Sequence, residues 1–309
     1  MSELPVKIRP MPTEEGILAF LARCDAFYPA DAVDAPIGQQ RAWYDALCAE
    51  FSPPMPVGLS KSDSLIDTIV PIRHYVPAEI RTPVRLLYLH GGGFVVGSLE
   101  SHDSICAEIA DRVGAELYSV DYRLAPEHLY PTQTDDCYTA LKWLFSAGHK
   151  VVLIGDSAGG NLAAGLSLRA RDDGWDGVVG QALIYPALGG DLVSGSYEEM
   201  SEAPGLTTAD VKYYRNLLLA PEDEPEAHPL LASSFVGLPP TYITVANFDP
   251  LRDDGRLYAA RLAEVGVEVW FREEPQMVHA WLRARHMSDG ARDGFRALCV
   301  AVSRLAGVL

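Results

Sequence analysis

The chain has 309 residues, 48% of them hydrophobic, so it is long and apolar enough to bury one large core. Its formal net charge of −17 argues against binding to nucleic acid or to anionic membranes and disfavours anionic substrates, because a basic patch would have to overcome the long-range repulsion and none is visible. Five cysteines are scattered without a Cys-x-x-Cys pair, which argues against a disulfide framework and against a zinc site.

The first fifty residues are predicted to contain helices and no targeting segment. Residues 1–7 hold no apolar core of signal-peptide length, and no apolar stretch of the chain is long enough to cross a bilayer, so a cytoplasmic protein is expected. Between Glu14 and Glu50, apolar residues recur at helical spacing and are interrupted by Pro29 and Pro36. This pattern predicts two short helices.

Extended structure is predicted to begin after a proline-rich linker at residues 52–58. Apolar and β-branched residues predict strands near 65–70 and 72–76, with only Pro71 between them. The sequence thus predicts a short hairpin at the edge of a sheet.

Three consecutive glycines follow the next predicted strand. The apolar run Val84–His90 leads directly into Gly91, Gly92 and Gly93. A flexible turn is one interpretation of this pattern. The other is an oxyanion hole, because glycine lets backbone N–H groups approach a tetrahedral intermediate where a side chain would obstruct them. His90 is expected to stabilise the loop by hydrogen bonding rather than to transfer protons.

A Gly-x-Ser-x-Gly pattern lies near the middle of the chain. The apolar run Val151–Ile154 leads into Gly155, Ser157 and Gly159, and a run of small residues suited to a packed helix comes next. This order predicts a strand, a sharp turn and a helix, with the serine hydroxyl projecting above a sheet. The flanking glycines let the backbone turn without a Cβ clash. The pattern alone arises by chance, but with the upstream glycine loop it indicates a nucleophile elbow.

The segment 187–228 is rich in glycine and proline and contains one predicted helix. This helix begins near Thr207 or Thr208, either of which can serve as its N-cap. Four of its side chains are candidates for lining a pocket, although side chains at this spacing more often only pack: Tyr213, Tyr214, Leu217 and Leu218.

A candidate acid and a candidate base follow two later strands. Asp249 comes directly after a predicted strand, at the carboxyl end where an open parallel sheet places its chemistry. Asp253 and Asp254 compete with it, but they lie at the start of a predicted helix, where acidic side chains favour the positive end of the dipole. His279 follows the strand-like Val267–Phe271, and its rival His286 is expected on the surface of the next helix.

These residues resemble a known family. His90–Phe94 and Gly155–Gly160 are similar to motifs of the bacterial hormone-sensitive-lipase-like esterases whose elbow reads Gly-Asp-Ser-Ala-Gly. Further segments agree with that family: Asp121–Glu127, Leu183–Pro186, Leu238–Pro240 and Asp249–Asp254. The resemblance runs from about Leu86 to the C-terminus. It implies an α/β-hydrolase fold, in which a mostly parallel central sheet is flanked by helices and carries a helical cap.

The resemblance also implies a division of the chain and a triad. Residues 1–55 would form an N-terminal helical cap segment, and residues 56–309 a catalytic domain with a second cap insertion at about 187–228. Asp249 would be the triad acid and His279 the base. The chain departs from the family in two places near this histidine, where glycine is common: Gln276 and Ala280. These departures concern the shape of the loop rather than the identity of the base.

The implied mechanism is acyl transfer by covalent catalysis. His279 would take the proton of Ser157 as the serine attacks an ester carbonyl, and Asp249 would hold the imidazole in the required tautomer. The oxyanion would be held by three backbone N–H groups, those of Gly91, Gly92 and Ala158. Neither a metal ion nor an organic cofactor is required.

The predicted function is hydrolysis of small-molecule carboxylic esters with short or medium acyl chains. Two alternatives remain open: an amidase or peptidase on the same fold, and a non-catalytic ligand receptor. The presence of His279 argues against the receptor, because receptors that resemble this family have lost that histidine. A homodimer is also expected from the resemblance, although no residue in the sequence identifies an interface.

Overall fold

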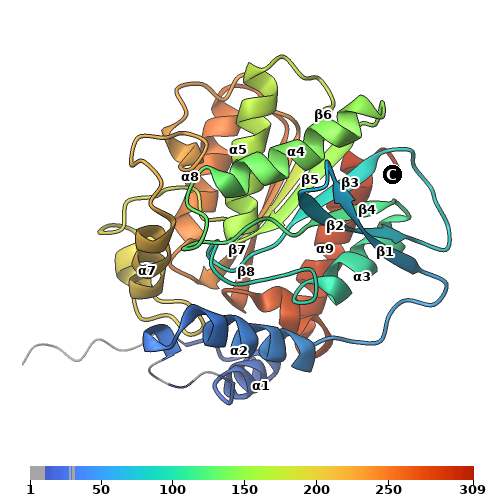
Figure 1. Cartoon of the computed structure of the whole chain (residues 1–309). Helices are drawn as coiled ribbons and strands as arrows, with labels where there is room; N and C mark the ends of the chain where they lie inside the picture. The colour runs from blue at the N-terminus through green and yellow to red at the C-terminus, as the bar shows by residue number, and fades with distance from the viewer. Residues whose placement is uncertain (1–10, 28, 30–31) are drawn as a thin grey trace, which may run out of the picture.

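The computed structural model describes residues 11–27, 29 and 32–309 (Figure 1). Residues 1–7, on which the expectation of no signal peptide rests, lie outside this part. None of the described helices combines the length and apolar character needed to span a membrane.

The strands are β1 (Ser60–Ile66), β2 (Val70–Val76), β3 (Arg85–Leu89), β4 (Leu117–Val120), β5 (Val151–Asp156), β6 (Val178–Ile184), β7 (Thr241–Phe248) and β8 (Val269–Val278). The helices are α1 (Glu15–Cys24), α2 (Ile37–Glu50), α3 (Asp103–Val113), α4 (Thr132–Ser146), α5 (Ala158–Asp172), α6 (Ser196–Glu199), α7 (Thr208–Leu218), α8 (Arg252–Glu264) and α9 (Asp289–Leu305).

The strands form one eight-stranded sheet in the order β1-β2-β4-β3-β5-β6-β7-β8. β2 runs antiparallel to both β1 and β4, and the other neighbouring pairs are parallel. Every residue of the central β5 is buried, as is typical of a parallel strand covered on both faces. Helices α3 and α9 pack into the core on one face of the sheet, and α4, α5 and α8 into the core on the other. The predicted mostly parallel sheet flanked by helices is confirmed.

The N-terminal hairpin differs from the prediction. β1 begins at Ser60, and the turn to β2 comprises residues 67–69, of which Asp67 and Thr68 have positive φ. Pro71 lies within β2, opposite Leu65. The first six residues of β1 are exposed and mostly polar, because this strand lies at the edge of the sheet. An exposed polar edge strand lacks the apolar alternation by which strands are recognised, so its start was missed.

The predicted helices agree with the structure better than the predicted hairpin does. α1 and α2 confirm the two short N-terminal helices. Thr207 is the N-cap of α7, where its hydroxyl accepts from the N–H of Asp210 and the Asp210 carboxylate accepts from the N–H of Thr207. The four-residue helix α6 was not predicted, and β8 continues beyond its predicted end through Pro275 to Val278.

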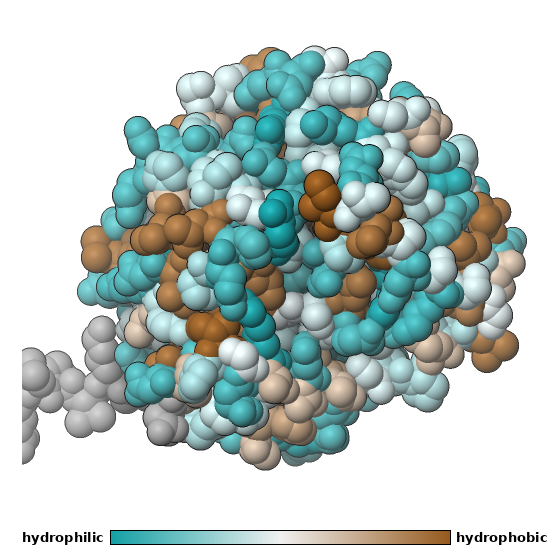
Figure 2. All heavy atoms as spheres, in the orientation of Figure 1, coloured by the Kyte–Doolittle hydropathy of each residue, from teal (hydrophilic) through white to brown (hydrophobic). Residues whose placement is uncertain are grey.

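The surface on the face shown in Figure 2 is mainly hydrophilic, with apolar side chains in separate groups. Exposed apolar residues such as Val57 and Val193 are ordinary on a folded protein. The excess of acidic over basic residues is consistent with this polar surface.

Candidate active site

Ser157 lies on a strained turn between β5 and α5. Its backbone has φ 56° and ψ −118°, a conformation that residues with a side chain rarely adopt. Gly155 and Gly159 are required because other backbone atoms lie too close to leave room for a side chain, and not because of their own dihedral angles. A Cβ on Gly155 would lie 2.1 Å from the carbonyl oxygen of Gly159, and a Cβ on Gly159 would lie 1.9 Å from that of Leu89. The pattern therefore folds as the predicted strand, sharp turn and helix.

Three predicted side chains meet at this turn. Nε2 of His279 lies 2.9 Å from Oγ of Ser157, and Nδ1 of His279 lies 2.7 Å from Oδ2 of Asp249. Because the carboxylate can only accept, Nδ1 carries the proton and Nε2 accepts from the serine hydroxyl. Asp249 follows the last residue of β7 and is fully buried, and its Oδ1 accepts from the N–H of Leu251. The geometry suits removal of the Ser157 proton by His279.

Ala280 occupies the position where the family commonly has glycine. Its φ of 62° is left-handed, which explains why glycine is favoured there. Alanine tolerates this conformation at a cost of about 1–2 kcal/mol. The departure noted in the sequence therefore leaves His279 in contact with Ser157.

The alternative candidates for the acid and the base, Asp253, Asp254 and His286, make their hydrogen bonds and ion pairs with residues other than Ser157. The Asp253 carboxylate accepts from the N–H of Ser196 and pairs with Arg256 at 2.9 Å. The Asp254 carboxylate accepts from the N–H groups of Leu188 and Gly190 and from the hydroxyl of Tyr197. Burial raises the pKa of Asp254 to about 6 in spite of these bonds. His286 binds the carboxylate of Glu108, with Nε2 at 2.9 Å from Oε1.

One of the three predicted oxyanion donors already has a hydrogen-bond acceptor in the structure. The N–H of Gly91 donates to Oδ1 of Asp156 at 3.0 Å, so this donor is already in use. Gly92, Gly93 and Ala158 line the same cavity as Ser157, whereas Gly91 does not. Among the described residues, no acceptor is found for the N–H groups of Gly92, Gly93 or Ala158. The oxyanion role predicted for Gly91 stays a prediction, and in this structure the N–H groups of Gly92 and Gly93 are the available ones in the loop.

The Asp156 carboxylate lies behind the glycine loop in a buried polar cluster. Its Oδ1 also accepts from the hydroxyl of Tyr88 at 2.8 Å, and Nε2 of His102 lies 3.3 Å away. Burial raises the pKa of Asp156, but the charge and hydrogen bond of His102, together with Arg283 and Tyr88, outweigh it and hold the pKa well below its usual value. A buried, ionised carboxylate thus anchors the loop.

His90 stabilises the same loop, as the sequence predicted. Nδ1 of His90 donates to the carbonyl oxygen of Gly91 at 2.8 Å, and the ring stacks on Tyr122 with 4.2 Å between centroids. Burial, followed by the neighbouring His102, lowers the pKa of His90 to about 3, so its imidazole is neutral at ordinary pH. Its Nε2 is buried without a partner among the described residues.

The serine opens into a cavity of about 380 Å³. One side is formed by α1 and α2, and the other by the glycine loop and α7. Of the four candidates on α7, Tyr214 and Leu218 line the cavity, whereas Tyr213 and Leu217 do not. The amide of Asn161 on α5 donates to the carbonyl oxygens of Ala187 and Ala227, near the two ends of the predicted insertion. Sequence patterns did not single out Asn161, because its role depends on contacts with distant residues.

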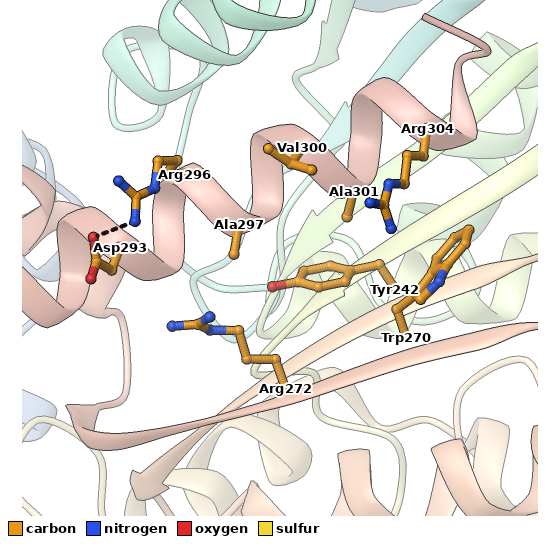
Figure 3. Close-up of a pocket in the computed structure, with 9 residues that line it drawn as sticks. All are labelled: Tyr242, Trp270, Arg272, Asp293, Arg296, Ala297, Val300, Ala301 and Arg304. Carbon is orange, nitrogen blue, oxygen red and sulfur yellow. Dashed lines mark ion pairs between the residues drawn. The ribbon is translucent and has the colours of Figure 1, made fainter. Parts of the chain in front are cut away.

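A second cavity of about 300 Å³ lies between α9 and the strands β7 and β8 (Figure 3). Its charged side chains include Arg272, Arg304 and an ion pair between Asp293 and Arg296. None of the predicted site residues lines this cavity. Within the described part of the chain, no group of three or more His, Cys, Asp or Glu side chains is arranged to hold a metal ion.

Comparison with known proteins finds esterases in sequence and in structure. A family model described as the α/β-hydrolase fold matches residues 86–283. Esterase LipI of Mycobacterium tuberculosis is 39% identical over 217 residues, which cover 67% of this chain and 68% of that protein. An arylesterase of Saccharolobus solfataricus is 33% identical over 288 residues, which cover 88% of this chain and 93% of that protein. The structure of an ester hydrolase from the metagenome of Lake Arreo has a TM-score of 0.86 at 29% identity, covering 95% of this chain and 99% of that one.

The family match spans more than half of the chain and includes the glycine loop and both Ser157 and His279. The relatives are named as esterases and arylesterases, in agreement with the chemistry expected from the motifs. The protein belongs to the α/β-hydrolase family and is a carboxylic ester hydrolase of its hormone-sensitive-lipase-like group.

Proposed function

We propose that the protein hydrolyses esters through a Ser157–His279–Asp249 triad and a covalent acyl-enzyme. His279 takes the proton of Ser157 as Oγ attacks the ester carbonyl, and it then gives that proton to the leaving alcohol. Water, activated by the same imidazole, releases the acid. Asp249 orients the imidazole and stabilises its positive charge. The observation that carries the proposal is the pair of hydrogen bonds made by His279, 2.9 Å to Ser157 and 2.7 Å to Asp249.

The oxyanion is held in this proposal by the N–H groups of Gly92, Gly93 and Ala158. All three residues line the cavity beside Ser157. The N–H of Ala158 also lies at the N-terminus of α5, where the helix dipole favours negative charge. Removal of one such donor typically costs about 100- to 1000-fold in kcat.

The cavity supports short- to medium-chain esters as substrates. A cavity of about 380 Å³, part of which must hold the alcohol group, leaves modest room for an acyl chain. The residues of α1, α2 and α7 that line it support a cap made of residues 1–55 and 187–228 on a catalytic domain of residues 56–309. A cytoplasmic location and a homodimer stay predictions.

The test is hydrolysis of p-nitrophenyl esters from acetate to palmitate by the wild type and four variants. Ser157→Ala and His279→Ala are expected to lower kcat at least about 10,000-fold, because both act in the same proton transfer. His286→Ala is the matched control for His279→Ala, and Asp253→Asn is a control substitution outside the triad; both are expected to retain activity. Wild-type activity should peak at short or medium chains.

Two results would contradict the proposal. Activity that survives Ser157→Ala would mean a different nucleophile. Wild-type protein that binds esters without hydrolysing any of them would favour the receptor instead. A parallel panel of p-nitroanilides with the same acyl groups distinguishes the amidase alternative, since an amidase would cleave them at rates comparable to the esters.

A further inference from the structure

A buried arginine lies in the same cavity as Ser157. Arg283 belongs to the 3₁₀ helix Trp281–His286, which begins two residues after His279. Its side chain lines the cavity, and only 5% of the residue is exposed. An arginine remains protonated in proteins, so the cavity contains a fixed positive charge.

Only neutral groups bind this guanidinium directly. Nε of Arg283 donates to Sγ of Cys48 at 3.1 Å, and Nη2 donates to the hydroxyl of Tyr44 at 2.5 Å. The guanidinium carbon also lies 5.0 Å from the centre of the Tyr44 ring. Burial raises the pKa of Cys48, so its thiol is neutral. No Asp or Glu of residues 11–27, 29 and 32–309 forms an ion pair with Arg283.

The nearby Arg285 is also buried, but it lies outside the cavity and forms an ion pair. It lies 2.7 Å from the Glu108 carboxylate and is 2% exposed. Buried charges are normally paired in this way, because an unpaired one is costly to remove from water. Arg283 has no such direct ion pair, although the buried Asp156 carboxylate is near enough for the two charges to attract each other. The guanidinium lies where a substrate can supply a directly bound anion.

Three carboxylates line the cavity: Asp25 is exposed to solvent, and Asp156 and Asp210 are bound to other groups. Asp156 accepts from Gly91 and Tyr88, and Asp210 caps α7 through Thr207. Nη1 of Arg283 makes no hydrogen bond to a described residue. The guanidinium therefore has both charge and a donor available to a ligand in the cavity.

We propose that the cavity selects esters that carry a carboxylate on their acyl or alcohol part, and that this carboxylate pairs with Arg283. This proposal rests on the ester hydrolysis proposed above. The net charge of −17 opposes it only at long range, since salt screens charges beyond about 8 Å at physiological ionic strength. Inside a buried cavity, the attraction between two close opposite charges is much stronger than in water.

The experiment compares esters that differ only by a carboxylate or a carboxamide. Monoethyl succinate is paired with ethyl succinamate, and monoethyl glutarate with ethyl glutaramate, which place the group on the acyl side. The pair 3-acetoxypropanoate and 3-acetoxypropanamide places it on the alcohol side. Release of alcohol is measured at neutral pH, and the readout is the ratio of kcat/KM between the two members of each pair.

In the wild type, at least one pair should favour the carboxylate about 10-fold or more, as expected for a hydrogen bond to a charged group. Arg283→Met should reverse the ratio for that pair, and Arg283→Lys should retain part of it. Arg304→Met is the matched control, because it removes the same charge from an exposed position on α9 and should leave the ratio as in the wild type.

A wild-type ratio at or below one in every pair would overturn the proposal, and so would equal ratios in the wild type and Arg283→Met. If Arg283→Met does not fold, inhibition of p-nitrophenyl butyrate hydrolysis by succinate and by the neutral diamide succinamide decides in the wild type. Stronger inhibition by succinate supports the proposal, and equal or weaker inhibition overturns it. Failure of the proposed function itself is distinct, since the neutral esters would then not be hydrolysed either.

Discussion

The backbone N–H of Gly91 donates a 3.0 Å hydrogen bond to the carboxylate of Asp156, the residue directly before Ser157. This bond joins the glycine loop to the turn that carries the serine. Gly92 and Gly93 directly follow Gly91 in the chain. The position of these proposed oxyanion donors relative to Ser157 therefore depends on Asp156, which has no contact with the substrate carbonyl in the proposed mechanism.

Asp156→Asn is expected to lower kcat for p-nitrophenyl butyrate about 100-fold, because a loop displaced by about 1 Å misplaces the oxyanion donors. The amide removes the negative charge, and its NH₂ group adds a donor where Tyr88, Gly91 and His102 already point donors at the carboxylate. Steady-state kinetics measure the effect, with the exposed Asp172→Asn as control. A kcat within about threefold of the wild type would show that Asp156 does not position the loop.

Ser157→Gly is expected to be more stable than Ser157→Ala by about 1 kcal/mol, although glycine is usually the less stable of the two in a fold. The reason is the backbone at φ 56° and ψ −118°, which glycine adopts freely and alanine does not. Urea unfolding of both variants measures the difference. Equal stabilities, or a more stable alanine variant, would mean that the turn stores no strain.

Gly159→Ala is expected to destabilise the protein by several kcal/mol, more than the roughly 1 kcal/mol typical of single substitutions. Its new Cβ would lie 1.9 Å from the carbonyl oxygen of Leu89, so the first turn of α5 would have to move away from β3. Gly38→Ala in α2 is the matched control, since nothing lies within 4 Å of its Cβ position. It should stabilise the protein by up to about 1 kcal/mol. Thermal or urea unfolding measures both changes.

Acid should destabilise the protein partly through His90. The pKa of this group falls from 6.5 in the unfolded chain to about 3 in the fold, so between these values the unfolded chain binds the extra proton. The contribution of His90 to stability is therefore complete above pH 6.5 and decreases as the pH falls toward 3. At pH 5 the loss amounts to about 2 kcal/mol.

His90→Asn provides the comparison, because its amide can still donate to the carbonyl oxygen of Gly91 but does not titrate. Urea unfolding at neutral pH and near pH 5 should show a smaller loss of stability for the variant than for the wild type. The absolute stability of the variant is expected to be lower at both pH values, since the stacking on Tyr122 is removed. An identical pH dependence in the two proteins would exclude His90 as a source of acid sensitivity.

Ser157 could be selected in advance because it depends on local order along the chain, whereas the choice of Asp249 and His279 over their rivals rests on the family resemblance. Ser157 follows an apolar strand and is flanked by glycines, and Asp249 and His279 each follow the end of a strand. Parallel strands bring their carboxyl ends to one edge of the sheet, so residues distant in sequence meet there. The exclusion of Asp253, Asp254 and His286 needed the structure, because it depends on the partners that hold them.

Gly91 is an example of a hydrogen bond that the sequence pattern does not predict. The sequence places three glycines after a strand but does not say which N–H groups are free, and the acceptor that takes the first is Asp156, 65 residues later. Asp156 stands at the variable position of Gly-x-Ser-x-Gly and belongs to the family's Gly-Asp-Ser-Ala-Gly elbow, but neither pattern indicates that its carboxylate binds the glycine loop. The polar start of β1 was not predicted for a related reason, since an exposed edge strand is recognised by its partner rather than by its own residues.

The sequence by itself determined the strand, sharp turn and helix around the nucleophile, the glycine loop and the ester chemistry that they indicate, because these follow from short patterns of residue type and backbone freedom. Tertiary structure alone decided which glycine N–H groups are available and where the cavity lies. It also decided that Arg283 meets Cys48, 235 residues away, and forms no direct ion pair with a described carboxylate. Such contacts depend on how distant segments pack, and neither the composition of a segment nor its periodicity contains that information.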